Sequence, residues 1–308
     1  MGPNSKSRAL GRRLFDQRYL LLLSVPFIIW LFIFCYIPLI GWLMAFQDYK
    51  PQLGWFASPW AGLKHFKDLF KAPMFYRSLQ NTLAMSFLML VFGTVTAITF
   101  AVLLNELRHL TFKRFTQTVS YLPHFVSWVV VSAIITQMLA LSGPVNEILL
   151  SIGIIKEPTN VMIKPEYFWF IVTFADIWKE MGWNAIIYLA AMAGIDAQIY
   201  EAAEIDGVNR FQKIWYVTLP GIQGTIVILL ILSIGNIINT GFERQFLLSN
   251  AVTSPKALVL DYYALNYGIG MFRYSYGTAI GVFKSVVSII LLVSANWIAK
   301  KSGNNRVF

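Results

Sequence analysis

The chain has few of the residues from which most catalytic and metal sites are built. Cysteine occurs once, as Cys35, which excludes a disulfide framework and a thiolate metal site. The three histidines, His65, His109 and His124, are too scattered to indicate a metal site. No G-x-x-x-x-G-K-[ST] phosphate loop occurs, and no nucleophile can be paired with a base. We therefore expect no metal, no cofactor and no enzymatic activity in this chain.

Charged residues are scarce as well. They make up 13% of the 308 residues, whereas 57% are hydrophobic and the mean hydropathy is +0.59. A typical soluble domain carries about 25% charged residues, so the composition indicates a membrane protein rather than a soluble protein with buried helices. The net charge of +10 requires no nucleic acid, because anionic lipids of the inner leaflet attract basic segments.

Six segments are long and apolar enough to cross a bilayer, which takes roughly 20 residues each. They are 19–47, 78–105, 115–146, 167–193, 214–242 and about 274–299. The first is too long for a signal-peptide core and no cleavage site follows it, so we expect it to be retained. The sequence predicts an all-α polytopic membrane protein. One six-helix domain spans 19–299, between an N-terminal segment 1–18 and a tail 300–308.

The positions of Lys and Arg predict the orientation. The N-terminal segment sets five cations against Asp16: Lys6, Arg8, Arg12, Arg13 and Arg18. The tail has Lys300, Lys301 and Arg306 and no acid. By the positive-inside rule both termini face the cytoplasm, as six spans require. Alternation then places loops 106–114 and 194–216 in the cytoplasm and loops 48–77, 143–166 and 243–273 outside.

The first outer loop departs from this charge rule. It holds five cations, Lys50, Lys64, Lys67, Lys71 and Arg77, against Asp48 and Asp68. This balance favours an acidic substrate or an acidic binding protein, although a solvated loop explains it equally well.

The densest charged stretch, EAAEIDGVNRFQKIWYVTLP at 201–220, falls in the longest cytoplasmic loop. Asp196 can cap a short helix over about 197–206, and Gly207 suits a helix end with positive φ. Asn209 and Gln212 form a capping pair for a second short helix. Pro220 suits the first turn of the fifth span. The sequence therefore predicts two short helices joined by a bend at Gly207.

The first of these helices carries a small apolar surface with a charged rim. Ile199, Ala202, Ala203 and Ile205 form the surface, and Glu201 and Glu204 lie beside it. Such a surface suits docking into a groove of another protein. An amphipathic linker on the membrane surface is the alternative, and the residues alone leave both open.

The spacing of this stretch resembles the EAA signature of ABC-importer permeases. The matching elements are Glu201-Ala202-Ala203, Gly207, Ile214 and Leu219-Pro220, in the family's order and spacing. Other stretches resemble carbohydrate permeases: SLQNTLAMS (78–86), YLPHFVSWVVVSAII (121–135), SGPVN (142–146) and IWKEMGWNAIIYLAAMAGID (177–196). GFERQFLLSN (241–250) and the segment 274–301 resemble the branch that imports complex oligosaccharides, such as lipo-oligosaccharide or alginate permeases.

The resemblance implies the MetI-like fold of type I importers in a bacterial inner membrane. It also implies a second permease subunit, two ATPase subunits that bind ATP and Mg, and an extracytoplasmic solute-binding protein. The signature residues would form a coupling helix that docks in the ATPase. They are Glu201, Ala202, Ala203, Asp206, Gly207, Ile214, Leu219 and Pro220.

Several polar residues inside the spans are candidates for the substrate path. Asp176, Lys179 and Glu180 share one face of the fourth span, and charges in a bilayer usually face a cavity or a partner helix. Mutual neutralisation of these charges is the alternative. Trp178, Trp183 and Asn184 could add the stacking and amide contacts that sugars accept, although tryptophan also gathers at membrane interfaces. Lys284 in the sixth span, unpaired in the sequence, either lines the path or meets an acid of the partner permease.

The leading hypothesis is thus an oligosaccharide-importing permease subunit. A permease for another solute, such as an amino acid or phosphate, shares the architecture. A secondary transporter or channel is the alternative from another class, and it would need no ATPase partner.

Overall fold

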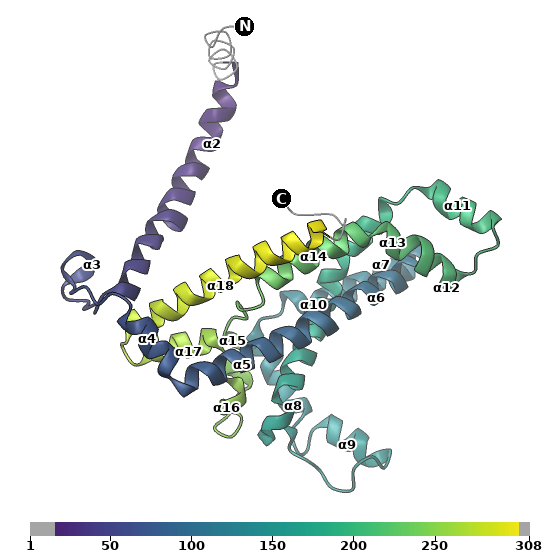
Figure 1. Ribbon diagram of the computed structural model, residues 1–308. Coiled ribbons are helices and arrows are strands. Elements are labelled where there is room, and N and C mark those ends of the chain that lie inside the picture. The colour runs from purple at the N-terminus through teal and green to yellow at the C-terminus, as the bar shows by residue number, and fades with distance from the viewer. Residues whose placement is uncertain (1–15, 302–308) are drawn as a thin grey trace.

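The computed structural model of the protein describes residues 16–301, and every regular element in this range is helical (Figure 1). The basic residues Lys6, Arg8, Arg12, Arg13 and Arg306 of the predicted cytoplasmic ends lie outside the described residues.

The long helical stretches are built from consecutive pieces. The first comprises α2 (Arg18–Leu31), η1 (Phe32–Tyr36) and η2 (Ile37–Phe46); the second α5 (Pro73–Leu88), η3 (Met89–Gly93) and α6 (Thr94–Asn105). Next come α7 (Leu110–Tyr121), η4 (Leu122–Phe125), α8 (Trp128–Met138) and α10 (Phe168–Ala193). After α11 (Ala197–Ile205) follow α12 (Arg210–Lys213), η7 (Ile214–Thr218), α13 (Leu219–Gly221), α14 (Gln223–Gly235) and finally α18 (Tyr274–Lys301).

Within residues 16–301, three helices are long and apolar enough to cross a membrane: Arg18–Phe46, Pro73–Asn105 and Tyr274–Lys301. Two bent pairs raise the number to five if each pair is one span. The fourth predicted span is α10, whose 26 residues are long enough but include three charged side chains. The all-α, polytopic prediction is confirmed, and its six segments correspond to three continuous helices, two bent pairs and α10.

The third predicted span is not one helix. Leu110–Phe125 and Trp128–Met138 meet at 103°. Pro123 has no N–H to donate, Val126 is extended, and the Ser127 hydroxyl accepts from Val130 N at 3.4 Å to start α8. The proline therefore ends one helix and the serine begins another.

The fifth predicted span is also broken. Arg210–Gly221 and Gln223–Gly235 meet at 59°, just after Pro220. Pro220 was predicted to lie in the first turn of the span. Helical backbone already begins at Arg210, so Pro220 instead lies at the bend. The helix ends at Gly235, short of the expected 242, where the Asn236 amide caps the Leu232 carbonyl at 3.2 Å. The second span begins at Pro73, earlier than expected.

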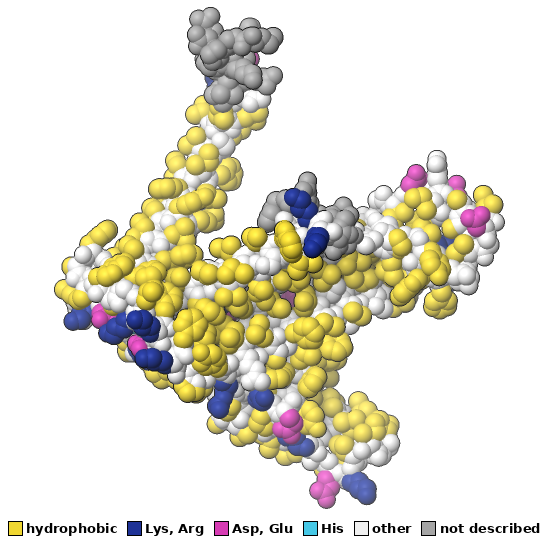
Figure 2. Space-filling model, in the orientation of Figure 1, with side chains coloured by type: hydrophobic (Ala, Val, Ile, Leu, Met, Phe, Trp, Pro, Cys, Tyr) yellow, Lys and Arg dark blue, Asp and Glu magenta, His cyan; other side chains and the backbone are white. Residues whose placement is uncertain are grey.

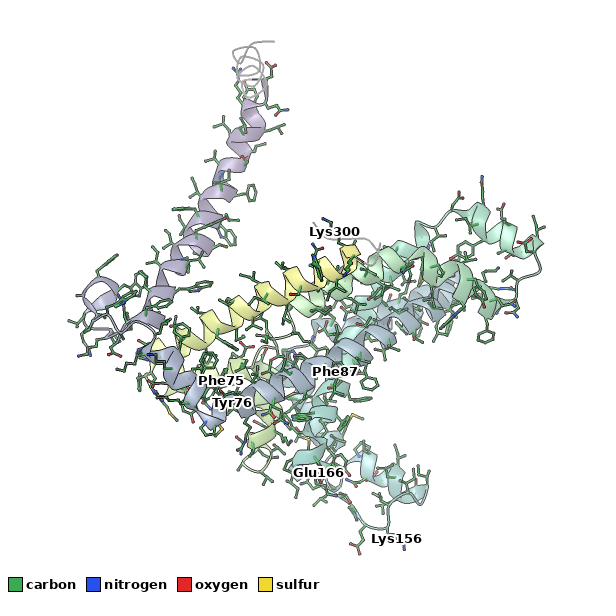
Figure 3. All side chains as sticks on the ribbon, in the orientation of Figure 1. Phe75, Tyr76, Phe87, Lys156, Glu166 and Lys300 are labelled. Atoms are coloured by element: carbon green, nitrogen blue, oxygen red, sulfur yellow. The ribbon has the colours of Figure 1, made fainter. Side chains whose placement is uncertain are left out.

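The surface of the long helices is apolar, whereas charged side chains gather towards the ends of the molecule (Figure 2). The Arg18–Phe46 helix projects from the body, and none of its most apolar window is buried. A lipid bilayer is the solvent that suits such a surface. In Figure 3, Lys156 and Glu166 lie in the lower part of the view, and Lys300 lies above them across the packed helices.

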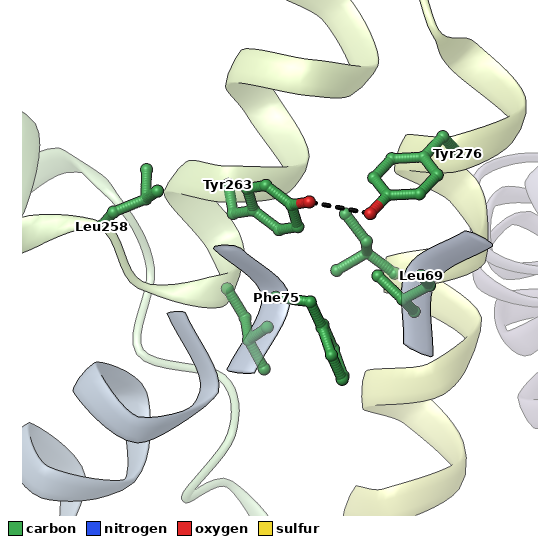
Figure 4. Packing of buried hydrophobic residues seen from close by; sticks show 7 residues of the cluster. Leu69, Phe75, Leu258, Tyr263 and Tyr276 are labelled. Carbon is green, nitrogen blue, oxygen red and sulfur yellow. Dashed lines mark hydrogen bonds between the residues drawn. The ribbon is translucent and has the colours of Figure 1, made fainter. Parts of the chain in front are cut away.

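One hydrophobic core joins the ends of several helices near the start of α18. Leu69 of α4 (Lys64–Lys71) and Phe75 of α5 pack with Tyr263 of α17 (Leu260–Ala264) and Tyr276 of α18 (Figure 4). The Tyr263 and Tyr276 hydroxyls are 2.7 Å apart, so this core also satisfies its polar atoms.

A second core joins α6 to α10 by small side chains. Ala97, Ala101 and Ala185 are fully or almost fully buried, and Tyr188 and Ile222 pack around them. Small residues let membrane helices approach closely. Gly182 serves the same purpose between α10 and α7, because a Cβ there would lie 2.2 Å from the Ser120 carbonyl oxygen.

Candidate coupling loop and substrate path

The predicted two-helix loop is present between α10 and α14. The Asp196 carboxylate accepts from Gln198 N at 3.0 Å and caps α11. The helix ends with Gly207 at φ 73°, while Gly207 N donates to Glu204 O and Val208 N to Ala203 O. This pair of bonds is a Schellman motif, which needs the left-handed residue that glycine supplies. The sequence prediction of a bend at Gly207 is confirmed.

The second short helix, α12, begins with the predicted capping box. Asn209 Oδ1 accepts from Gln212 N, and Gln212 Oε1 accepts from Asn209 N, both at 2.9 Å. An ion pair between Glu204 and Lys213 joins α11 to α12. The Tyr200 and Thr218 hydroxyls, 3.1 Å apart, tie α11 to η7. The bend is therefore held at three points beyond the glycine.

The predicted coupling residues divide into two groups by burial. Ala203 is buried, and Ile214 and Leu219 pack against the core between α6 and α10. The others are exposed: Glu201, Ala202, Asp206, Gly207 and Pro220. The first group holds the loop on the body of the protein, and the second is available to another protein.

We expect the Glu204–Lys213 pair to stiffen the loop only slightly, because Glu204 is exposed. The hydrogen bond and charge of Lys213 hold the pKa of the Glu204 carboxyl below its ordinary value. A lowered pKa means that the pair is complete above the ordinary glutamate pKa of about 4.3 and is lost only as the pH falls through the lowered value. Amide exchange over α11 and α12, corrected for intrinsic rates, should not change from roughly pH 5 to 8.

The matched variant for that measurement is Glu204→Gln, which removes the charge and keeps the shape. Its loop amides should exchange a few-fold faster at neutral pH, an effect of the size expected for an exposed ion pair. Unchanged exchange in Glu204→Gln would show that the capping bonds alone hold the bend.

Two acids of α10, Asp176 and Glu180, each pair with a residue from a distant part of the chain. Arg244, on α15 (Glu243–Leu248), donates from Nη1 to Asp176 Oδ1 at 2.7 Å. Glu180 lies 2.7 Å from His124 Nδ1 and 3.4 Å from Lys179 Nζ. Lys179 therefore has one of the two predicted acidic neighbours, because Asp176 pairs with Arg244. The sequence reading missed Arg244, which lies 68 positions from Asp176.

Lys179 makes its other contacts with the backbone of the bent third span. Its Nζ donates to the carbonyl oxygens of Pro123 and His124. These carbonyls lie at the proline break, where the Pro123 carbonyl also accepts from Val126 N at 3.1 Å. Lys179 is 5% exposed, so this cation serves the packing of α10 against the break.

Lys284 pairs with Asp261 of α17 in the same chain. Asp261 also accepts from Gly241 N at 2.9 Å through its other oxygen. The description of Lys284 as an unpaired cation in the sixth span is therefore wrong. Its acid lies in the outer-loop region that precedes the sixth span in this chain, which the sequence analysis did not consider as a partner.

The described part of the chain contains a polar cavity of about 300 Å³ between α5–α6, α10 and α14. Asn184 lines it, together with the polar side chains Ser86, Thr94, Ser233, Asn236, Asn239, Thr240 and Arg244. The other candidates do not line it: Asp176, Trp178, Lys179, Glu180, Trp183 and Lys284. Trp183 instead stacks on His124, with ring centroids 4.2 Å apart.

No group of three or more His, Cys, Asp or Glu side chains among residues 16–301 could hold a metal ion.

Comparison with known proteins identifies close relatives of this chain. It is 42% identical over 304 residues to the polygalacturonan/rhamnogalacturonan transport system permease protein YteP of Bacillus subtilis (strain 168), covering 98% of this chain and 94% of the relative. It is also 42% identical to Protein LplB of the same organism, covering 95% of this chain and 92% of that protein.

A solved structure has the same fold. A chain of a bacterial ABC transporter involved in the import of the acidic polysaccharide alginate superposes with a TM-score of 0.86 and 36% identity. The match covers 95% of this chain and 99% of that chain. The same kind of transporter, in complex with alginate pentasaccharide-bound periplasmic protein, gives a TM-score of 0.87.

Residues 89–303 match the family described as "Binding-protein-dependent transport system inner membrane component". The resemblance noted from the EAA spacing and the all-helical, MetI-like fold agree with this match. The chain is therefore a member of the family of ABC-importer permeases, the inner-membrane components of binding-protein-dependent transport systems.

Proposed function

We propose that this chain forms half of the translocation pathway of an ATP-driven importer for oligosaccharides or polysaccharide fragments. The observation that carries this proposal is similarity over nearly the whole chain to permeases named for polysaccharide transport. Similarity of this extent includes both the transmembrane helices and the loops between them. The alternative of an amino-acid or phosphate permease has no comparable support.

The proposed coupling element is the loop 194–216 with its EAA residues. In Figure 1, α11 and α12 lie at one end of the molecule, beyond the packed helices. Ile205 is 87% exposed and Phe211 is 85% exposed. Apolar side chains on a projecting, capped loop favour docking into a groove of an ATPase subunit. Glu201, Ala202 and Asp206 are exposed and would contribute to that contact.

The proposed substrate path includes the polar cavity at Asn184. Hydroxyl and amide side chains line it beside apolar ones such as Met89, Ile187 and Leu229. Amides both donate and accept hydrogen bonds, as sugar hydroxyls require. Asp176 borders this path through Arg244, whereas Lys179, Glu180 and Lys284 make contacts that hold helices together.

The proposed assembly contains a second permease subunit, two ATP-binding subunits with Mg, an extracytoplasmic solute-binding protein and membrane lipid. One related structure is a complex with a substrate-bound periplasmic protein. We propose that both termini face the cytoplasm, which places the 194–216 loop on the side of the ATPase subunits.

Purification of the chain from its own cells tests the assembly. We expect an ATP-binding chain to co-purify, and uptake of an oligosaccharide into vesicles to require hydrolysable ATP. Uptake driven by an ion gradient with no ATP-binding partner would instead establish a secondary transporter. Uptake of amino acids or phosphate by the complex would support the other-solute alternative.

A further inference from the structure

The polar cavity contains one cation. Among the described side chains that line it, Arg244 is the single charged one, beside the amides of Asn184, Asn236 and Asn239. Arginine is costly inside a membrane protein and is usually retained for a pairing or binding role. Its counterion here, Asp176, is 3% exposed and does not line the cavity. Of this ion pair, the Arg244 cation therefore lines the cavity and the Asp176 carboxylate does not.

The ion pair leaves much of the guanidinium unused. Nη1 donates to Asp176 Oδ1 at 2.7 Å, while Nε is buried and has no hydrogen-bond partner in the described part of the chain. Guanidinium offers five N–H donors in a planar fork that matches carboxylate oxygens. The Arg244 side chain is 21% exposed and lines the cavity, so donors other than the buried Nε are open to a ligand there.

We propose that Arg244 and the neighbouring amides form a subsite for the carboxylate of an acidic sugar residue. This inference rests on the proposed function and narrows its substrate class to uronate-containing oligosaccharides. The carboxylate binds the guanidinium donors that face the cavity, and the sugar hydroxyls bind the amides. Asp176 holds the guanidinium in place from behind, and acts as a positioning residue.

The basic outer loop does not carry this inference, because one of its cations is already neutralised. Lys64 donates to both oxygens of Asp48 at 2.9 and 3.0 Å. Arg244 differs because it lines the cavity and its bond to Asp176 uses one of its five N–H donors.

The test uses the whole complex reconstituted in liposomes, with its ATPase subunits and binding protein. The two probes are trigalacturonate and its methyl ester, which share the sugar chain and differ in the charge of the carboxyl groups and in the added methyl groups. The variant is D176N/R244Q, because removal of Arg244 alone would leave the Asp176 carboxylate buried and unpaired. The control is R273Q, which removes an exposed arginine that stacks over the Tyr276 ring at 4.4 Å.

The wild-type complex should prefer the acid to the ester. The double variant should lower the acid-to-ester uptake ratio by about tenfold or more, as expected for loss of a charge-assisted hydrogen bond. R273Q should keep the wild-type ratio. R244K, which keeps the charge without the planar fork, should give an intermediate ratio.

Three results would overturn the subsite. They are equal uptake of both probes by wild type, an unchanged ratio in D176N/R244Q, and loss of both probes together, since a carboxylate subsite is not needed for the ester. Failure of the proposed function is distinct from these results. It would appear in the wild-type complex, as uptake of neither probe and of no neutral oligosaccharide.

Discussion

Replacing Gly207 with proline is expected to abolish ATP-driven uptake while the chain still reaches the membrane. Gly207 has φ 73°, whereas proline fixes φ near −65°. Gly207 N also donates to Glu204 O at 3.1 Å, and proline has no N–H for this bond. The orientation of α11 relative to α12 would therefore change, and a docked loop transmits movement only if its shape is fixed.

Two further substitutions separate backbone conformation from bulk at this position. A Cβ at Gly207 would meet no atom within 4 Å, so any effect of alanine comes from the left-handed backbone alone. That conformation costs an ordinary residue about 1–2 kcal/mol, and asparagine tolerates it better. We expect uptake to fall in the order glycine, asparagine, alanine, proline.

Uptake into vesicles tests both expectations. The amount of chain in the membrane is measured by immunoblot, so that uptake can be compared per chain. Wild-type uptake by Gly207→Pro would refute the coupling role of the bend. Equal loss in the asparagine and proline variants would refute the conformational explanation.

Replacing Gly182 with alanine is expected to destabilise the chain by about 1–3 kcal/mol or more, the range for overpacking. The added Cβ would lie 2.2 Å from the carbonyl oxygen of Ser120 and 2.6 Å from its carbon. These are backbone atoms, which cannot rotate away as a side chain can. Helices α7 and α10 would have to separate, and the contact of Glu180 with His124 would be strained.

The matched control is Gly281→Ala in α18. A Cβ at Gly281 meets nothing within 4 Å, and alanine is intrinsically the better helix former. Thermal unfolding of the detergent-solubilised chain should show a lower midpoint for Gly182→Ala and an unchanged or higher midpoint for Gly281→Ala. Equal shifts in the two variants would mean that the close crossing at Gly182 does not limit stability.

The loop around Gly207 could be predicted from the sequence because its determinants are local. Asp196, Asn209 and Gln212 cap helices through bonds to residues two or three positions away. Helix caps follow from such short patterns. The apolar segments likewise indicated the membrane helices, because the length of a span is set by the bilayer.

The ion pairs could not be predicted, because their partners meet only in the folded chain. Arg244 and Asp176 are 68 positions apart, and Lys284 and Asp261 are 23 apart. The sequence showed that charged residues lie within the spans, but it did not show which acid each cation would pair with. The bends at Pro123 and Pro220 had a local signal in proline, but the angles of 103° and 59° depend on how neighbouring helices pack.

The contact of Lys179 with the carbonyls of Pro123 and His124 has a mechanical consequence. A lysine on one helix donates to two carbonyls of a second, interrupted helix, so sliding α10 past the interruption would break both of these bonds. The Pro123 carbonyl would keep its bond from Val126 N. The lysine therefore holds α10 against the junction of α7 with α8. During a transport cycle these three helices should travel as one rigid body, with the relative motion taken up at other helix contacts.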